Sequence, residues 1–196
     1  EVRSAAVDAG AALARRYVRD AHADAGNVGA DAFQEIGRGD RFVLVESWRD
    51  QSSLQAHEMA AHTLEFRRQL DAIHRSPNDQ RITHGFSIDP RKAPGAPGAL
   101  YVVTHVDVPV AQRQQAEALL GLFASGSRGA HGNVRYDVYQ QLGRRSNHFE
   151  VFAIWSGQGA FNAYQDSPTW LKFRSQLAPL EGALYDQRLY RRLDAG

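Results

Sequence analysis

The 196-residue chain contains no cysteine, which excludes disulfides, thiolate metal sites and cysteine nucleophiles. No hydrophobic run approaches the roughly 20 residues that a membrane-spanning helix needs, so we expect no membrane segment. Neither sign of charge is in clear excess, because the formal net charge is +1 and lysine and arginine are scattered along the chain. We therefore do not expect nucleic acid as a partner.

Signatures of several enzyme classes are also missing. The chain has no glycine-rich phosphate-binding loop and no nucleophile turn of the hydrolase type. His57 and His62 are five residues apart, which is not the i, i+4 spacing of a helical zinc pair, so we expect no metal. The remaining histidines are scattered and are expected on the surface: His22, His74, His84, His105, His131 and His148.

What the chain does contain is one pattern present twice. The segment from Phe42 to Trp48 returns 107 residues later, from Phe149 to Trp155, and two shorter blocks recur in the same order. An internal repeat predicts a repeated architecture. Residues kept in both copies are expected to hold the fold, whereas reactive residues present in one copy are better functional candidates.

The repeat predicts two units joined by a linker. We expect a first unit at residues 1–88, a linker rich in proline and glycine at 89–99, and a second unit at 100–196. The first two residues align with Asp107 and Val108, so most of the first strand of the first unit is expected to lie upstream, and the native N-terminus is not visible. Units of about 90 residues are marginal alone, which favours their packing against each other.

Each copy is predicted to follow the order strand, helix, strand, strand, helix, strand, which is the ferredoxin-like unit. The strand that begins at Phe42 has apolar residues on both faces, which indicates a sheet covered on both sides. The last strands are predicted at residues 80–86 and 183–193. The predicted class is therefore α+β, with two tandem ferredoxin-like units packed sheet to sheet as a pseudo-dimeric α/β barrel.

Two cap signals locate the second helical region of each copy. Ser52 is predicted to cap the helix after Trp48, with Gln55 completing a capping box. In the second copy Ser167 and Pro168 predict a new helix start, so we expect the helix to be broken there.

Ionisable residues form a candidate site in the first copy only. Glu46 shares a strand face with Trp48, and His57 and His62 follow in the next helical region. A buried carboxylate needs a partner, and a neighbouring histidine can act as a general base. At the positions of Glu46, His57 and His62, the second copy has Ala153, Tyr164 and Thr169. The first copy is therefore interpreted as the active one, although partly exposed histidines and neutral differences remain an alternative at this point.

Charged residues kept in both copies are interpreted first as scaffold. Arg67 matches Arg174, and Asp79 matches Asp186. Arg67 is in addition a candidate to bind an anionic substrate oxygen, because a guanidinium forms strong charge-assisted hydrogen bonds.

The first copy resembles the core motif of the antibiotic biosynthesis monooxygenase domain through Phe42, Glu46, Trp48, Asp50, Leu54, His57, His62 and Phe66. The second copy resembles it more loosely through Trp155, Phe161, Tyr164, Ser167 and Phe173. Members form dimeric α/β barrels, which implies an intramolecular pseudo-dimer here, with a further homodimer as an added expectation. The family includes cofactor-independent oxygenases that convert anthrones or quinols to quinones.

The resemblance implies a cofactor-independent monooxygenase that oxidises a phenolic, quinol or anthrone-type aromatic with O2. It implies His57, His62 and Glu46 as catalytic residues and Trp48, Phe66 and Arg67 as substrate-binding residues. The implied partners are a small aromatic substrate and O2, without nucleic acid or membrane, and the expected location is the cytoplasm.

Three other functions remain open. One is a non-enzymatic small-molecule-binding or stress-associated barrel, and another is an isomerase of a small carbonyl compound that uses Glu46 and His57. Haem degradation, which also occurs in the family, is disfavoured. The axial histidine of that branch lies 19 residues after the strand tryptophan, where this chain has Arg67 and Arg174, and arginine does not ligate iron.

Overall fold

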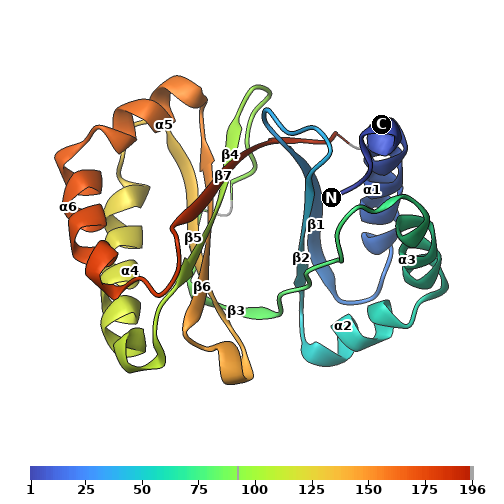
Figure 1. Ribbon diagram of the computed structural model, residues 1–196, viewed down its shortest axis with the longest axis horizontal. Helices are drawn as coiled ribbons and strands as arrows, with labels where there is room; N and C mark the ends of the chain where they lie inside the picture. The colour runs from blue at the N-terminus through green and yellow to red at the C-terminus, as the bar shows by residue number, and fades with distance from the viewer. Residues whose placement is uncertain (92, 195–196) are drawn as a thin grey trace. The chain divides into compact units, whose positions relative to one another are not determined.

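The computed structural model describes residues 1–91 and 93–194, and its contacts divide the chain into two units (Figure 1). Unit 1 comprises Glu1–Asp79 and the described residues from Tyr190 onward, and unit 2 comprises Gln80–Leu189. The last strand of the first sequence copy thus belongs to unit 2, and the end of the last strand of the second copy belongs to unit 1. Both units combine antiparallel strand pairs with helices, so the predicted α+β class with ferredoxin-like units is confirmed.

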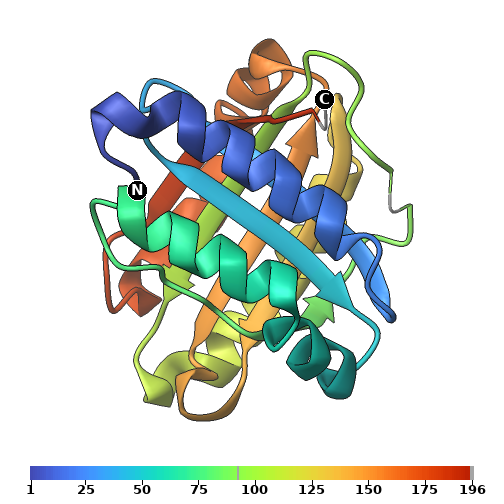
Figure 2. The ribbon, with the colours of Figure 1, turned by 90° about the vertical axis from the view of Figure 1, so that its right-hand side faces the viewer.

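The described part of unit 1 consists, in chain order, of α1 (Val7–Ala21), β1 (Asn27–Glu35), β2 (Phe42–Trp48), α2 (Gln51–Glu58), α3 (Ala61–Ile73) and the end of β7 (Asp186–Arg192). Its strands follow the order β2-β1-β7, with β1 antiparallel to both neighbours. Helices α1 and α3 lie side by side over one face of these strands (Figure 2). This arrangement brings the helical residues of unit 1 over the end of β2, where the candidate site lies.

The core of unit 1 follows from the spacing of small apolar residues in α1. Ala11, Ala14, Val18 and Ala21 recur every three or four residues, so they share one helical face. That face packs with Ala30, Ala32 and Leu193 in one buried cluster. Burial of this face fixes the rotation of α1, and with it the direction of the Tyr17 side chain, which is also buried.

The described part of unit 2 consists of β3 (Thr83–Ser87), β4 (Leu100–Asp107), α4 (Arg113–Arg128), β5 (Asn133–Gln141), β6 (His148–Trp155), α5 (Gln158–Gln165), α6 (Pro168–Leu177) and the beginning of β7. Its strands follow the order β7-β4-β6-β5-β3. The core is aromatic: Phe123 stacks on Phe173 at 3.6 Å between ring centroids, and the fully buried Trp155 lies 4.4 Å from Tyr164. Trp155 thus packs the core of its unit, as expected for a residue kept in both copies.

Helix boundaries agree with one cap prediction and correct the other. Ser167 begins α6 as predicted, because its Oγ accepts a hydrogen bond from the Trp170 amide. Ser52 is not the cap of α2. Asp50 has an extended backbone and its Oδ1 accepts from the Ser53 amide at 2.8 Å, which places Ser52 inside the first turn.

His105 is half-buried, with 24% of its side chain exposed, so the expectation of a surface position holds only in part. It is opposite Glu150 in the β4–β6 register, and its Nδ1 lies 2.8 Å from Arg81 Nη1. Burial, followed by the charge of Arg81, lowers the pKa of His105, while burial raises the pKa of Glu150. This cluster is consistent with a scaffold role for Arg81, which forms an ion pair with Glu150 at 3.5 Å.

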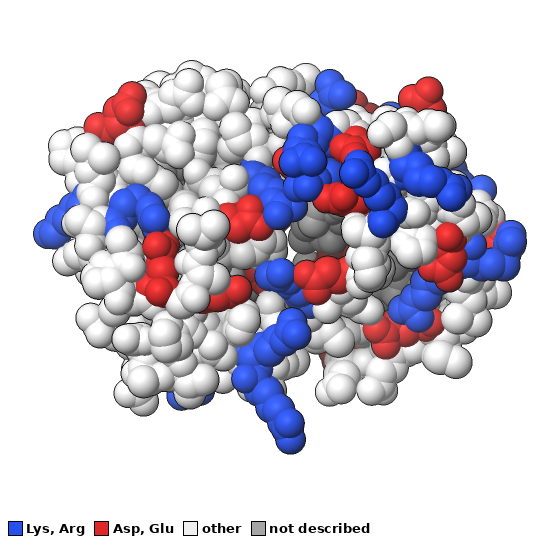
Figure 3. All heavy atoms as spheres, in the orientation of Figure 1, with Lys and Arg blue, Asp and Glu red and all other residues white. Residues whose placement is uncertain are grey.

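Charged side chains of both signs are mixed over the face of the molecule shown in Figure 3. None of the helices in the described ranges is long and apolar enough to cross a membrane.

The turn before β5 is closely packed at Gly132. Its φ is +77°, and an added Cβ would lie 2.4 Å from Ala160 Cβ. Because both backbone strain and overlap result, we expect Gly132→Ala to lower the free energy of unfolding by about 2–4 kcal/mol in urea denaturation.

Two matched glycines separate these effects. Gly143 has φ +69° with no atom within 4 Å, so Gly143→Ala is expected to cost only the strain, about 1 kcal/mol. Gly129 has φ −86°, and an added Cβ would meet only the Gly126 carbonyl oxygen at 3.6 Å, an ordinary contact, so Gly129→Ala should cause almost no loss. Equal losses for Gly132→Ala and Gly143→Ala would show that the Ala160 contact is not rigid.

Candidate functional site

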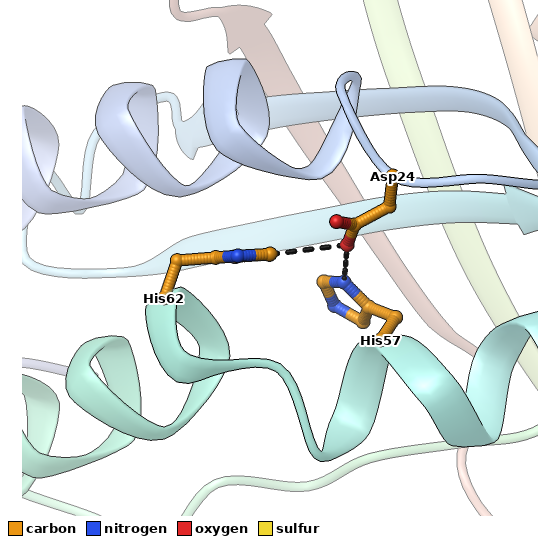
Figure 4. A group of neighbouring side chains, drawn as sticks. All are labelled: Asp24, His57 and His62. Atoms are coloured by element: carbon orange, nitrogen blue, oxygen red, sulfur yellow. Dashed lines mark hydrogen bonds and ion pairs between the residues drawn. The ribbon is translucent and has the colours of Figure 1, made fainter.

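The candidate site lies within unit 1, where four segments meet. Glu46 and Trp48 come from β2, His57 from α2 and His62 from the first turn of α3. The fourth segment is the turn after α1, which contributes Asp24 (Figure 4). The structure therefore brings together the three residues expected to be catalytic and adds a carboxylate that the sequence did not indicate.

His57 lies at the centre of the site and is only 2% exposed. Its Nδ1 lies 2.6 Å from Asp24 Oδ2, and its Nε2 lies 2.7 Å from the Tyr17 hydroxyl. The Asp24 carboxylate can only accept, so Nδ1 carries the imidazole proton and donates to it. In the neutral ring Nε2 is then the acceptor, and the Tyr17 hydroxyl donates to it. Burial, followed by the negative charge of Glu46, raises the pKa of Tyr17.

Neighbouring side chains restrict the His57 ring. The Trp48 ring lies 4.5 Å away at an interplanar angle of 32°. The buried Thr63 places its Oγ1 3.3 Å from His57 Nε2. A ring that is hydrogen-bonded at both nitrogens and packed on its face has little freedom to turn toward a substrate, so His57 is better placed to orient other groups.

His62 approaches the same carboxylate from α3 and is more accessible. Its Nε2 lies 3.1 Å from Asp24 Oδ2, and its side chain is 26% exposed, against 1% for His57. Figure 4 shows the Asp24 carboxylate between the two imidazoles. The His62 Nε2 atom is buried but has no well-aligned hydrogen bond. One carboxylate oxygen therefore faces two imidazole nitrogens.

The three side chains Asp24, His57 and His62 form a set that could hold a metal ion, since one ligand atom of each lies within 4.8 Å of the others. The spacing argument against a metal pair assumed one continuous helix, which is wrong here. Helix α2 ends at Glu58 and α3 begins at Ala61, so the two histidines approach each other across a helix break.

Glu46 lies beside the histidine without a direct hydrogen bond to it. Its Oε2 accepts from Trp48 Nε1 at 3.3 Å, which agrees with the predicted common strand face. Its Oε1 lies 3.8 Å from His57 Nε2, and this buried atom has no hydrogen-bond partner. Glu46 adds to the effect of burial on Tyr17, because both its negative charge and its side-chain contact raise the pKa of that hydroxyl.

The remaining predicted residues lie at the edge of this cluster. Phe66 packs on the Tyr17 ring at 4.1 Å between centroids. The Arg67 side chain is 42% exposed, and its guanidinium lies 3.9 Å from a Glu58 carboxylate oxygen. Phe66 thus supports Tyr17, while Arg67 is accessible from outside.

In the second copy, every polar position of the site is replaced by a residue that cannot act as an acid or base near neutral pH. The residues equivalent to Tyr17, Asp24, Glu46, His57, His62 and Thr63 are Phe123, Ala130, Ala153, Tyr164, Thr169 and Trp170. The Tyr164 hydroxyl is hydrogen-bonded to Ser127 Oγ at 2.6 Å, and burial raises the pKa of Tyr164. Beside it is an open hollow of about 440 Å³, lined partly by Ala130, Ala163 and Thr169.

Residues 1–69 and 99–176 match the family model described as antibiotic biosynthesis monooxygenase, which is well over half of the chain. The chain belongs to the antibiotic biosynthesis monooxygenase family. The resemblance predicted from the sequence is thereby confirmed, and membership supports a monooxygenase-like function.

One curated relative, "Putative monooxygenase YcnE" of Bacillus subtilis (strain 168), is 33% identical over 49 residues. The match covers 25% of this chain and 52% of that protein, so the chain spans about half the length of this curated relative.

Solved structures show the same fold. A protein described as a putative monooxygenase from Fusobacterium nucleatum has a TM-score of 0.84 at 14% identity, over 99% of this chain and 89% of that chain. An anthrone oxidase-like protein has a TM-score of 0.76 at 14% identity, over 100% and 90%. At these identities the similarity establishes the fold and not the substrate.

A double-mutant cycle tests the hydrogen-bonded relay, defined as Tyr17 to His57 to Asp24. Tyr17→Phe and Asp24→Ala each remove one partner of the same buried imidazole, so each is expected to lower the free energy of unfolding by about 1–3 kcal/mol. Because both act on one ring, their effects should deviate from additivity by about 0.5 kcal/mol or more in urea denaturation.

The control pairs Tyr17→Phe with Asp8→Ala, an exposed position near the start of the same helix. That pair should be additive to within about 0.5 kcal/mol. Additivity of the Tyr17 and Asp24 variants as well would contradict the relay.

Proposed function

We propose that the chain is a cofactor-independent monooxygenase that oxidises a phenolic, quinol or anthrone-type aromatic with O2 at the unit 1 site. Family membership supports the oxygenase class. The main structural support is the ordered set Tyr17, His57, Asp24 and His62, which places an accessible imidazole beside a carboxylate already held by a second imidazole. The second copy has no such set among its described residues.

His62 is the proposed general base. Asp24 lies beside the Nε2 atom of His62, so Nε2 carries the proton of the neutral imidazole. The other nitrogen, Nδ1, does not contact Asp24 and accepts the proton of the substrate hydroxyl. The Asp24 carboxylate then stabilises the imidazolium. His57 does not reach the substrate in this scheme. It donates to Asp24, which fixes its tautomer, and is a positioning residue; its other nitrogen accepts from Tyr17.

The proposed reaction needs no additional reductant. The phenolate transfers one electron to O2, giving a phenoxyl radical and superoxide, which recombine to form a carbon–oxygen bond. The resulting peroxide takes up a proton and loses water, which leaves a carbonyl on the oxidised carbon. The net conversion is substrate plus O2 to quinone plus water, and the base is regenerated when His62 returns its proton.

The surrounding residues have supporting roles in this proposal. Arg67 is accessible and cationic, so it can stabilise the oxyanion that develops on the substrate. Trp48 supplies an aromatic wall beside the histidines. Phe66 supports this region indirectly through its contact with Tyr17. The negative charge of Glu46 adds to burial in raising the pKa of Tyr17.

Oxygen consumption with a panel of anthrones and hydroquinones tests the proposal. We expect uptake above the blank for at least one compound, with one quinone formed per O2 consumed. Because a positioned base typically contributes 10²–10⁴-fold, His62→Ala should lower the rate by about that factor, and added imidazole should restore part of it.

The matched control is His22→Ala, which removes an exposed histidine next to α1 and should leave the rate unchanged. The proposal fails if no compound gives uptake above the blank, or if His62→Ala is as active as the His22→Ala control.

A further inference from the structure

We infer that Asp24, His57 and His62 form a binding site for a divalent first-row transition metal ion such as Zn²⁺. The site goes beyond the proposed oxidation and does not depend on it. Two imidazole nitrogens and one carboxylate oxygen are a donor set that these ions favour. Cysteine is absent from the chain, so a histidine and carboxylate set is the kind of transition-metal site open to it.

The distances suit a common ion. Asp24 Oδ2 lies 2.6 Å from His57 Nδ1 and 3.1 Å from His62 Nε2, and one atom from each side chain lies within 4.8 Å of the others. Zinc bonds to nitrogen and oxygen are about 2.0–2.2 Å long, so the ligand atoms of one ion lie roughly 3 Å apart. Small movements of the Asp24 side chain would open the space that the ion needs.

An unpartnered buried atom supports this assignment. His62 Nε2 is buried and has no hydrogen-bond partner, although a carboxylate oxygen lies 3.1 Å away. Buried polar atoms in native proteins nearly always have a partner, and a missing ion is one reason for an exception. An ion between Asp24 and His62 would give this nitrogen a partner.

The surroundings of His57 match the outer contacts of metal-bound histidines. Such a histidine usually donates its second ring nitrogen to an oxygen acceptor, which orients the ring. When Nδ1 binds the ion, Nε2 carries the proton and faces the Tyr17 hydroxyl at 2.7 Å and Glu46 Oε1 at 3.8 Å. Glu46 Oε1 is the second buried atom without a partner, and it becomes the natural acceptor.

The site is open enough for an ion to enter and keep a water ligand. The side chains of Asp24 and His62 are 22% and 26% exposed. Ion binding uses the His62 nitrogen that otherwise faces Asp24. The remaining nitrogen then carries the proton, so His62 cannot act as the proposed base while an ion is bound. An ion at this site is therefore expected to inhibit metal-free oxidation.

Binding is tested without substrate, so its failure is separate from failure of the proposed function. Metal-stripped protein is titrated with Zn²⁺ by calorimetry, and with Co²⁺ by visible absorption, which reports the ligand geometry. We expect one ion per chain and a rise in Tm with Zn²⁺. His62→Ala should weaken binding by at least tenfold, and Glu46→Gln by about 10-fold or more through the lost outer contact.

Two further variants control for folding and for unspecific histidine binding. The triple variant Asp24→Ala, His57→Tyr, His62→Thr introduces the residues of the second copy, and circular dichroism checks its fold. His131→Ala removes an exposed histidine from the corresponding loop of the second copy and should bind as the parent does. Absence of binding by the folded parent protein at millimolar Zn²⁺, or equal binding by His62→Ala, would overturn the inference.

Discussion

The contact between the Asp24 carboxylate and the buried His57 imidazole is the interaction on which the rest of the site depends. Burial of an imidazole without partners at both nitrogens is costly, so the Asp24 contact requires a second partner on the far side of the ring. Tyr17 supplies it from α1. In the metal-free site the Asp24 carboxylate can only accept, so His57 Nδ1 carries the proton and Nε2 accepts from the Tyr17 hydroxyl.

This constraint explains why the second copy lacks the whole set of polar site residues and not just one of them. A partly satisfied polar network in a core is less stable than an apolar core of the same shape. The second copy has accordingly replaced the whole set, with Phe123 for the tyrosine and Ala130 for the aspartate. The hydroxyl of its Tyr164 is paired with Ser127. Shared aromatic residues such as Trp48 and Trp155 hold the common fold, and the polar set is an addition to one copy.

Much of the fold and part of the site could be predicted from the sequence. The repeat, the α+β class and the break before Pro168 follow from local patterns, because hydrophobic periodicity and caps act over a few residues. Glu46, His57 and His62 were found by comparing the copies. Asp24 and Tyr17 were missed because they belong to another segment, 33 and 40 residues from His57, and only tertiary packing brings them to it. Comparing the copies at these two positions would have been a usable signal.

Other features of the structure also lie beyond local sequence patterns. Helical spacing does not hold between His57 and His62, because the helix breaks between Glu58 and Ala61. His105 is half-buried because it contacts Arg81 and Glu150, and nothing local in the sequence indicates these contacts. The unit to which each last strand belongs depends on long-range strand pairing, which no local pattern encodes.

The most direct measurement of the central interaction is the tautomer of His57 in metal-free protein, read by NMR of ¹⁵N-labelled histidines. The chain has eight histidines, and His57 is predicted to be the Nδ1–H tautomer with a slowly exchanging proton held by Asp24. Finding His57 as the Nε2–H tautomer, or with a rapidly exchanging ring proton, would contradict the relay on which this account rests.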